Sequence, residues 1–292
     1  MNGMSVTDLA TAPTAETAPT AAAAPTAGRP GARLFMCPPT FFAVSYRINP
    51  WMDPAWPVDA VRAVGEWERV AAAYCALGHE VTVADAVPGL PDLVFTANAG
   101  VVHDGRVLLA RFRHPERAPE AAAYAAAFWA AGYTDITPST YVNEGQGDYL
   151  AAGGVVLGAS GFRTDPRSHD EVAEFTGLPV VGLELVDPRF YHLDTALAVL
   201  DDDLVAYWPG AFSGASRGVL EELFPDAVLA TEDDARAFGL NAWSDRRTVV
   251  LAAGAPHLSA AVRDRGFATV ELCTTELQRA GGSVKCCTLE MR

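Results

Sequence analysis

A unit of about 45 residues recurs along this chain and limits the folds that it can adopt. Each copy has the pattern of a β-hairpin with a glycine, then a helix, then a single strand. Corresponding positions lie 44 to 53 residues apart, at Phe95, Asp148, His192 and Leu240. Because every repeat contains a helix, an all-β propeller is excluded. We therefore predict an α/β fold in which five ββαβ units form a single-domain, five-bladed α/β propeller.

Hydrophobic periodicity and turn residues predict the elements of each unit. The first unit has predicted strands at 33–37 and 80–84 and a helix at 58–77, whose apolar face contains Val61, Val64, Trp67, Val70 and Tyr74. The later units have predicted hairpins at 94–110, 149–157, 192–208 and 240–252, helices at 115–131, 168–175, 216–223 and 258–265, and strands at 135–137, 178–185, 227–230 and 268–272. We expect a final buried strand near Leu289 to return to the first unit.

Residues 1–30 differ in composition from the rest of the chain, because Ala, Thr, Pro and Gly dominate them. They lack the apolar content of a core, so we predict a disordered tail at 1–30 and a folded domain at 31–292. The tail has no basic segment followed by an apolar stretch, so we do not expect a signal peptide. No run approaches the roughly 18 apolar residues of a membrane span.

The formal net charge of −15 argues against nucleic acid and anionic membranes as partners. The negative charge is compatible with a small cationic substrate and with a homo-oligomer. The five cysteines have neither CxxC spacing nor the pattern of a secreted disulfide framework. We therefore expect free thiols and a cytoplasmic location.

Two adjacent thiols, Cys286 and Cys287, follow a pair of glycines near the end of the chain. A cysteine thiolate is a strong nucleophile near neutral pH. It needs a cationic or polar environment, and Lys285 is the nearest cation in sequence. The alternative is that both cysteines are small apolar core residues on a buried strand.

Polar clusters interrupt apolar runs at the starts of several hairpins. On a strand, His192 and Asp194 would share one face, although a histidine there is also a common core residue. The carboxylates of Glu144 and Asp148 enter an apolar strand, and buried carboxylates need a cation. The nearest basic residue after them is Arg163, so the cation could be a ligand.

Five motifs, FTAN, EGQGD, GFRTD, YHLDTA and GGSVKCC, occur here in order. In this order and spacing the chain resembles the guanidino-group-modifying superfamily from about residue 36 to residue 291. That superfamily includes dimethylarginine dimethylaminohydrolases, arginine deiminases, arginine dihydrolases and amidinotransferases. The segments MCPP and INPWM are similar to bacterial dimethylargininases and to arginine dihydrolases. The resemblance implies the pentein fold, a five-bladed α/β propeller.

The resemblance also implies roles for individual residues. Cys286 would be the nucleophile, His192 the general acid/base, and Glu144 the carboxylate that binds guanidinium and positions the histidine. The implied substrate-binding residues are Asn49, Asn98, Asp148, Arg163 and Asp194. Among them, Arg163 would hold the substrate's α-carboxylate, far from the reacting carbon.

The implied activity is hydrolysis of a guanidinium C–N bond through a cysteine-linked thiouronium, without a metal or cofactor. Dimethylarginine is the expected substrate, with citrulline and dimethylamine as products. Arginine deiminase and arginine dihydrolase remain alternatives, because the chain lies between the two patterns. It has neutral Asn98 where deiminases have aspartate, and Asp194 where mammalian dimethylargininases have lysine. An amidinotransferase or a non-catalytic propeller that only binds a partner is less favoured.

Overall fold

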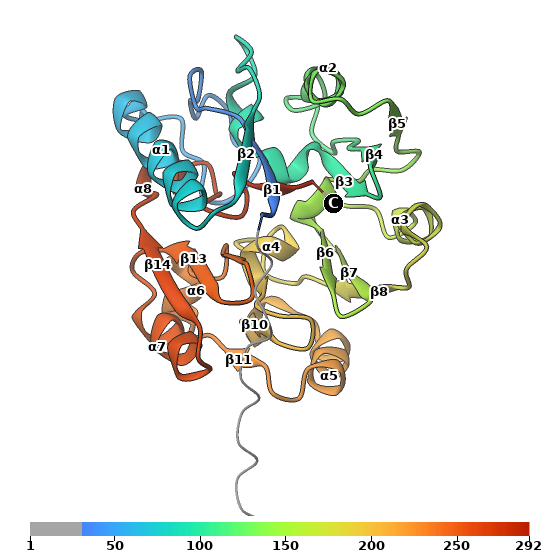
Figure 1. Cartoon of the computed structure of the whole chain (residues 1–292), viewed down its shortest axis with the longest axis vertical. Helices are drawn as coiled ribbons and strands as arrows, with labels where there is room; N and C mark the ends of the chain where they lie inside the picture. The colour runs from blue at the N-terminus through green and yellow to red at the C-terminus, as the bar shows by residue number, and fades with distance from the viewer. Residues whose placement is uncertain (1–30, 292) are drawn as a thin grey trace, which may run out of the picture.

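The computed structural model describes residues 31–291, which contain five three-stranded sheets. Figure 1 shows these sheets next to one another around the centre of the molecule, with the longer helices on the outside. The predicted tail at 1–30 lies outside the described residues. Across residues 31–291, no helix combines the length and the apolar character that crossing a membrane requires.

Four of the sheets are built from consecutive segments in one way. An antiparallel hairpin is followed by a helix, and the helix leads to a strand that pairs parallel to the second hairpin strand. The four units are β3 (Gly100–His103), β4 (Arg106–Leu109), α2 (Glu120–Ala130) and β5 (Asp135–Pro138); β6 (Tyr149–Ala152), β7 (Val155–Ser160), α3 (Ser168–Thr176) and β8 (Val180–Glu184); β9 (Leu197–Val199), β10 (Val205–Tyr207), α5 (Gly214–Leu223) and β11 (Val228–Leu229); β12 (Trp243–Ser244), β13 (Thr248–Ala252), α7 (Pro256–Asp264) and β14 (Ala268–Leu272). The predicted ββαβ unit is thus confirmed.

The first sheet joins the two ends of the described chain. β1 (Arg33–Met36) pairs parallel to β2 (Glu80–Val83) and antiparallel to β15 (Leu289–Glu290). α1 (Ala60–Ala76) connects β1 to β2. The expectation that the last strand returns to the first unit is confirmed.

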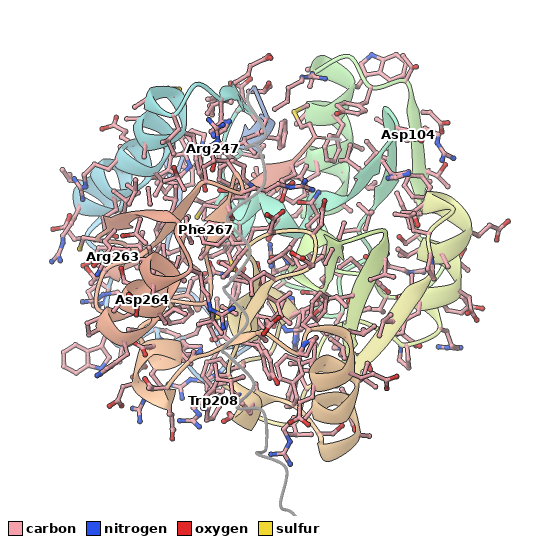
Figure 2. All side chains as sticks on the ribbon, turned by 60° about the horizontal axis from the view of Figure 1, so that its bottom comes forward. Asp104, Trp208, Arg247, Arg263, Asp264 and Phe267 are labelled. Carbon is pink, nitrogen blue, oxygen red and sulfur yellow. The ribbon has the colours of Figure 1, made fainter. Side chains whose placement is uncertain are left out.

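Burial decreases from the hairpins to the parallel strands. Every residue of β13 is buried, whereas β14 contains only exposed and partly buried residues. In Figure 2, Arg263 and Asp264 of α7 lie toward the outside of the molecule, and Phe267, just before β14, lies further in. The hairpins therefore form the inner wall of the molecule, and loops at their ends can meet near its centre.

Local sequence explains several boundaries. Asp59 caps α1 by accepting the N–H of Arg62, and Trp67, Val70 and Tyr74 are buried as predicted. The prediction that Val61 belongs to the apolar face is wrong, since this residue is 85% exposed. It lies in the first turn of the helix, where the solvent-facing side begins.

Two turn residues fix the ends of β3 and β4, which they connect. Asp104 and Gly105 both have positive φ, as a two-residue hairpin turn requires.

The predicted helix at 115–131 begins only at Glu120 because residues 114–119 form turns that the Arg117 side chain helps to hold.

Two strand predictions at functional positions are wrong. Leu193–Ala196 is a helical turn, α4, with His192 as its N-cap, so His192 and Asp194 do not share a strand face. Cys286 and Cys287 lie in turns before β15. Side-chain hydrogen bonds from other units satisfy the backbone at both places. The short helices also missed from sequence are α6 (Glu232–Arg236), α8 (Thr275–Gln278), η1 (Pro91–Val94), η2 (Thr96–Ala99), η3 (Gly145–Gly147) and η4 (Pro209–Ala211).

Candidate active site

The Cys286 turn is held in place by Asn241, which precedes β12. Asn241 Oδ1 accepts the backbone N–H groups of Ser283 at 3.0 Å and Cys286 at 3.1 Å. Its Nδ2 lies 3.1 Å from Cys286 Sγ and also donates to the carbonyl of Asp194. One buried amide therefore sets both the backbone and the thiol of the nucleophile candidate.

Cys286 and Asp194 form a buried thiol–carboxylate pair. Cys286 Sγ donates to Asp194 Oδ2 at 3.2 Å. Burial raises the pKa of Asp194 to about 7, although Lys285 and hydrogen bonds from Cys286 and Asn241 oppose the rise. Burial and the Asp194 carboxylate raise the pKa of the Cys286 thiol well above its ordinary value. This raised pKa keeps Cys286 a thiol at neutral pH.

A second cluster is centred on Glu144, which is fully buried. Its Oε2 lies 2.8 Å from His192 Nε2 and 2.9 Å from Arg163 Nη1, and its Oε1 accepts the N–H of Arg113 at 3.1 Å. Burial alone would raise the pKa of Glu144, but the Arg163 charge and the His192 hydrogen bond hold it well below its usual range. Glu144 is therefore an anion that orients His192.

Arg163 is held by contacts with several groups of the site. Its guanidinium pairs with Glu144, donates to the carbonyl of Ile48 at 3.1 Å, and lies 4.5 Å from the centre of the Tyr191 ring. Arg163 and Glu144 are thus in direct contact, and the role of Arg163 in holding the substrate's α-carboxylate stays a prediction. Residues 143–148 carry no basic side chain, so Arg163 supplies the cation that the buried Glu144 needs.

Asp148 connects the two clusters. Its Oδ1 accepts the N–H of Leu193 at 3.1 Å, and its Oδ2 lies 4.0 Å from His192 Nε2. Burial raises the pKa of Asp148 to about 6, with the nearby His192 opposing the rise. Asp148 thus holds the start of α4, the turn that presents His192 and Asp194 together.

Asn98 lies against the Glu144 loop with both ends of its amide engaged. Its Nδ2 donates to the carbonyl of Glu144 at 3.0 Å, and its Oδ1 accepts from Arg117 Nη1 at 2.9 Å. Gly147 permits this approach, because a Cβ there would lie 2.2 Å from Asn98 Nδ2. Arg117 is itself buried and paired with Glu120.

Asn49 belongs to the loop between β1 and α1. Its Nδ2 donates to the carbonyl of Ala280 at 2.9 Å, and its Oδ1 accepts the N–H of Trp51. A Cβ at Gly281 would lie 3.0 Å from the Asn49 amide, so Asn49 is next to the segment that leads to Cys286. Trp51 Nε1 donates to the carbonyl of Arg189, which ties this loop to the segment before His192.

The predicted residues therefore come together from several units. Two buried carboxylate oxygens, Asp148 Oδ2 and Asp194 Oδ1, have no hydrogen-bond partner within residues 31–291, and neither has His192 Nδ1. Unpaired buried acceptors beside a thiol suit a cation that is rich in N–H donors. Among the described residues, no group of three or more His, Cys, Asp or Glu side chains could hold a metal ion.

Sequence reasoning missed Asn241 and Arg117. Asn241 follows Leu240, the landmark of its unit, so its place in the repeat was the available signal. Arg117 lies in a segment predicted as helix, and nothing local distinguished it. Lys285, the expected cation for the thiol, directs its ammonium to Gln146 Oε1 and the Thr288 carbonyl.

No family model matches the chain. It is 53% identical over 259 residues to an N(G),N(G)-dimethylarginine dimethylaminohydrolase of Mycobacterium tuberculosis, a match that covers 89% of this chain and 85% of the relative. It is 36% identical to the bifunctional arginine dihydrolase/ornithine cyclodeaminase AgrE of Nostoc, of which it spans 38%.

Solved structures show the same fold. The N-terminal domain of the arginine dihydrolase ArgZ, a cysteine-to-serine variant bound to substrate, matches with a TM-score of 0.85 and 33% identity over 89% of this chain and 98% of that one. A dimethylarginine dimethylaminohydrolase carrying an S-methyl-L-thiocitrulline adduct matches with a TM-score of 0.75 at 17% identity, over 89% of this chain and 99% of that one. The predicted membership is thus confirmed, and the chain belongs to the dimethylarginine dimethylaminohydrolase family within the guanidino-group-modifying superfamily.

Proposed function

We propose that the protein hydrolyses N-omega,N-omega-dimethylarginine to citrulline and dimethylamine. The observation that carries this function is the buried Cys286 thiol, hydrogen-bonded to Asp194 beside a His192–Glu144 pair. The 53% identical relative that bears the name of this activity supports it. A small cationic substrate also fits the buried carboxylates that lack donors among residues 31–291.

The substrate brings positive charge to the site. The guanidinium donates N–H groups to Asp194 and Asp148, which stabilises both as carboxylates. The added positive charge lowers the pKa of the Cys286 thiol, which passes its proton to His192, so that the thiol becomes a thiolate and the histidine becomes protonated. Sγ then adds to the guanidinium carbon, and a carbon–sulfur bond forms as the carbon becomes tetrahedral.

His192 transfers the proton that the leaving group needs. Because Nε2 is held by Glu144, Nδ1 is the ring atom without a partner among the described residues. The protonated histidine gives its proton to the dimethylamino nitrogen, the C–N bond breaks, and an S-alkylthiouronium remains on Cys286. His192 next takes a proton from water, the water oxygen attacks the carbon, and the C–S bond breaks to release citrulline. General acid/base transfer of this kind contributes about 10²–10⁴-fold in rate.

Arginine dihydrolase is the second candidate. The 36% identity to AgrE and the fold match to ArgZ favour it. A variant of the ArgZ domain is described as covalently bound to a reaction intermediate, so that relative uses covalent chemistry. Neutral Asn98 is compatible with either substrate. Arginine deiminase stays a further alternative on the same carbon. Amidinotransferase and a non-catalytic binding propeller are less favoured, since a paired thiol, acid and histidine suit hydrolysis.

The proposal also covers the domain organisation, the location and the oligomeric state of the protein. We infer that residues 31–292 are one catalytic domain and that its five sheets close into a propeller, which the β1–β15 pairing supports. The five cysteines are free thiols, which supports a cytoplasmic location. We also propose that the protein forms a homo-oligomer, which sedimentation analysis would test.

A product assay tests the proposed function. The protein is incubated separately with dimethylarginine and with arginine, and dimethylamine, ammonia, citrulline and ornithine are quantified. Dimethylamine and citrulline in equal amounts, with little turnover of arginine, support the proposal. Two ammonia molecules and ornithine from arginine would instead identify a dihydrolase, and one ammonia with citrulline a deiminase.

A further inference from the structure

Lys285 is the only lysine in the chain, and the other 20 of the 21 basic residues are arginines. It directly precedes Cys286, and its side chain is buried, with 4% of the residue exposed. Burying an ammonium group is costly unless it is paired and hydrogen-bonded. A lysine at this one position therefore needs a reason that the roles assigned above do not provide.

The contacts of Lys285 link two parts of the candidate site. Its Nζ donates to Gln146 Oε1 at 3.1 Å and to the carbonyl of Thr288 at 2.9 Å. Gln146 lies in the loop between Glu144 and Asp148. The same Gln146 amide accepts the N–H of Glu290 at 2.9 Å and donates to its carbonyl at 2.8 Å. Lys285 and Gln146 thus fasten the carboxylate loop to the segment that carries the nucleophile.

The charge of Lys285 also acts on Asp194. Burial raises the pKa of Asp194 to about 7, and the Lys285 ammonium limits this rise. Cys286, Cys287 and Tyr191 also interact with Asp194, and burial keeps all three protonated at neutral pH. On its other side Lys285 lines a cavity together with Asp201, Asp202, Arg246 and Glu290.

We propose that Lys285 is a positioning residue for the reaction proposed above: its buried ammonium fixes the Glu144–Asp148 loop against the Cys286 turn and stabilises the Asp194 carboxylate that receives the guanidinium. A compact ammonium with three donors suits a site with two oxygens at different angles. The planar guanidinium of arginine is larger and would not reproduce that geometry. Lys285 therefore acts on the thiol through Asp194 and the loop.

The pH dependence of activity separates this role from a purely structural one. Asp194 must be ionised to bind the guanidinium, so kcat/KM should rise with pH as Asp194 loses its proton. Removing the cation raises the pKa of Asp194, so the rise should move to higher pH in Lys285→Met. A nearby opposite charge shifts a carboxyl pKa by about 1–3 units, and we expect a displacement of about one pH unit. The loss of kcat/KM should accordingly be about tenfold larger at pH 6 than at pH 9.

Two control variants accompany Lys285→Met. Lys285→Arg keeps the charge, so its kcat/KM should rise over the same pH range as the wild type, whatever its absolute rate. Arg246→Met removes another cation from the same cavity, where Arg246 pairs with Asp201 and Asp202. It should leave the pH profile unmoved. If Lys285→Met has an unmoved profile as well, the proposed action on Asp194 is wrong.

The single lysine also permits a direct measurement on the unaltered protein. With lysine labelled by ¹³C at Cε, the NMR spectrum contains one lysine side-chain signal, from Lys285. Its chemical shift should follow a titration with a midpoint near pH 7, and this step should disappear in Asp194→Asn. A signal without that step, or with the same step in Asp194→Asn, overturns the proposal even if Lys285→Met does not fold. This measurement needs no substrate, so it stays informative if the proposed activity fails.

Discussion

Replacing Glu144 with glutamine should damage both stability and turnover. The side chain keeps its size but loses the charge that accepts from Arg163 at 2.9 Å and His192 at 2.8 Å. Arg163 would remain as a buried guanidinium, 3% exposed, without its carboxylate. Breaking a buried ion pair by removing one partner costs about 3–5 kcal/mol. We expect a decrease in the unfolding free energy near the lower value, because the amide oxygen can still accept one bond.

The expected decrease in kcat follows from the changed hydrogen bond between residue 144 and the His192 ring. Glutamine can offer its N–H₂ to the ring, which disfavours the tautomer that keeps Nδ1 free to accept a proton. The variant can then lose the whole rate enhancement from general acid/base catalysis, so kcat should fall by about 10²–10⁴-fold. The pKa of Glu144 lies well below its usual range, so its stabilising charge is present at neutral pH and is lost as pH falls through that lowered pKa. The stability difference between the two proteins should therefore be constant from pH 6 to pH 8.

Steady-state kinetics with dimethylarginine and urea unfolding measure the two effects. Glu66→Gln is the matched control, since Glu66 is also fully buried and accepts from the backbone of Glu276 and from Thr275. It belongs to the α1–α8 contact, so it should lower stability and leave kcat unchanged. The reasoning is refuted if Glu144→Gln retains kcat within threefold of the wild type, or if Glu66→Gln loses as much kcat.

Further predictions concern the neighbouring residues. Cys286→Ser should abolish turnover while the fold is retained. Cys287→Ser should keep substantial activity, because Cys287 packs in an apolar cluster and its side chain has no polar partner in the described site. If Cys287→Ser is inactive and Cys286→Ser is active in steady-state kinetics, Cys287 is the nucleophile. Asp194→Asn should make the unfolding free energy fall less steeply between about pH 4 and 7, because the raised pKa of Asp194 makes the folded wild type hold a proton that the unfolded chain releases. Asp148, whose pKa is also raised, keeps part of the slope. Urea unfolding at pH 5 and pH 8 measures the slope, and an unaltered slope would contradict this prediction. Arg163→Ala should lower kcat as well as raise KM, since it unpairs Glu144, and kinetics with an analogue that lacks the α-carboxylate should show whether it also anchors that group.

The repeat could be predicted because each unit has its own hydrophobic pattern. Helix and strand positions of the four later units follow local periodicity, and their boundaries agree with the structure to within a few residues in most cases. The helix at 115–131 starts late because the preceding turns are fixed by the buried pair of Arg117 and Glu120. Such a pair forms only after the helix has packed, so periodicity carries no trace of it.

The geometry of the candidate site could be predicted only in part. Sequence motifs bring Cys286, His192 and Glu144 to attention, yet the helical turn after His192 depends on Asp148, 45 positions from Leu193. The turn at Cys286 depends on Asn241 in the same way. Hydrogen bonds between distant units replace the ladder that a strand would need, and local propensity contains no information about them.

Rapid quenching of the reaction tests the role of Cys286 most directly. The protein is mixed with excess dimethylarginine, acid-quenched within the first turnover, and digested with trypsin, which cleaves after Lys285 and releases residues 286–292. Fragmentation of that peptide distinguishes Cys286 from Cys287. We predict a thiouronium adduct on Cys286 that disappears as citrulline forms, and no adduct in Cys286→Ser. An adduct on Cys287, or citrulline formation by Cys286→Ser at the wild-type rate, would contradict the proposed mechanism.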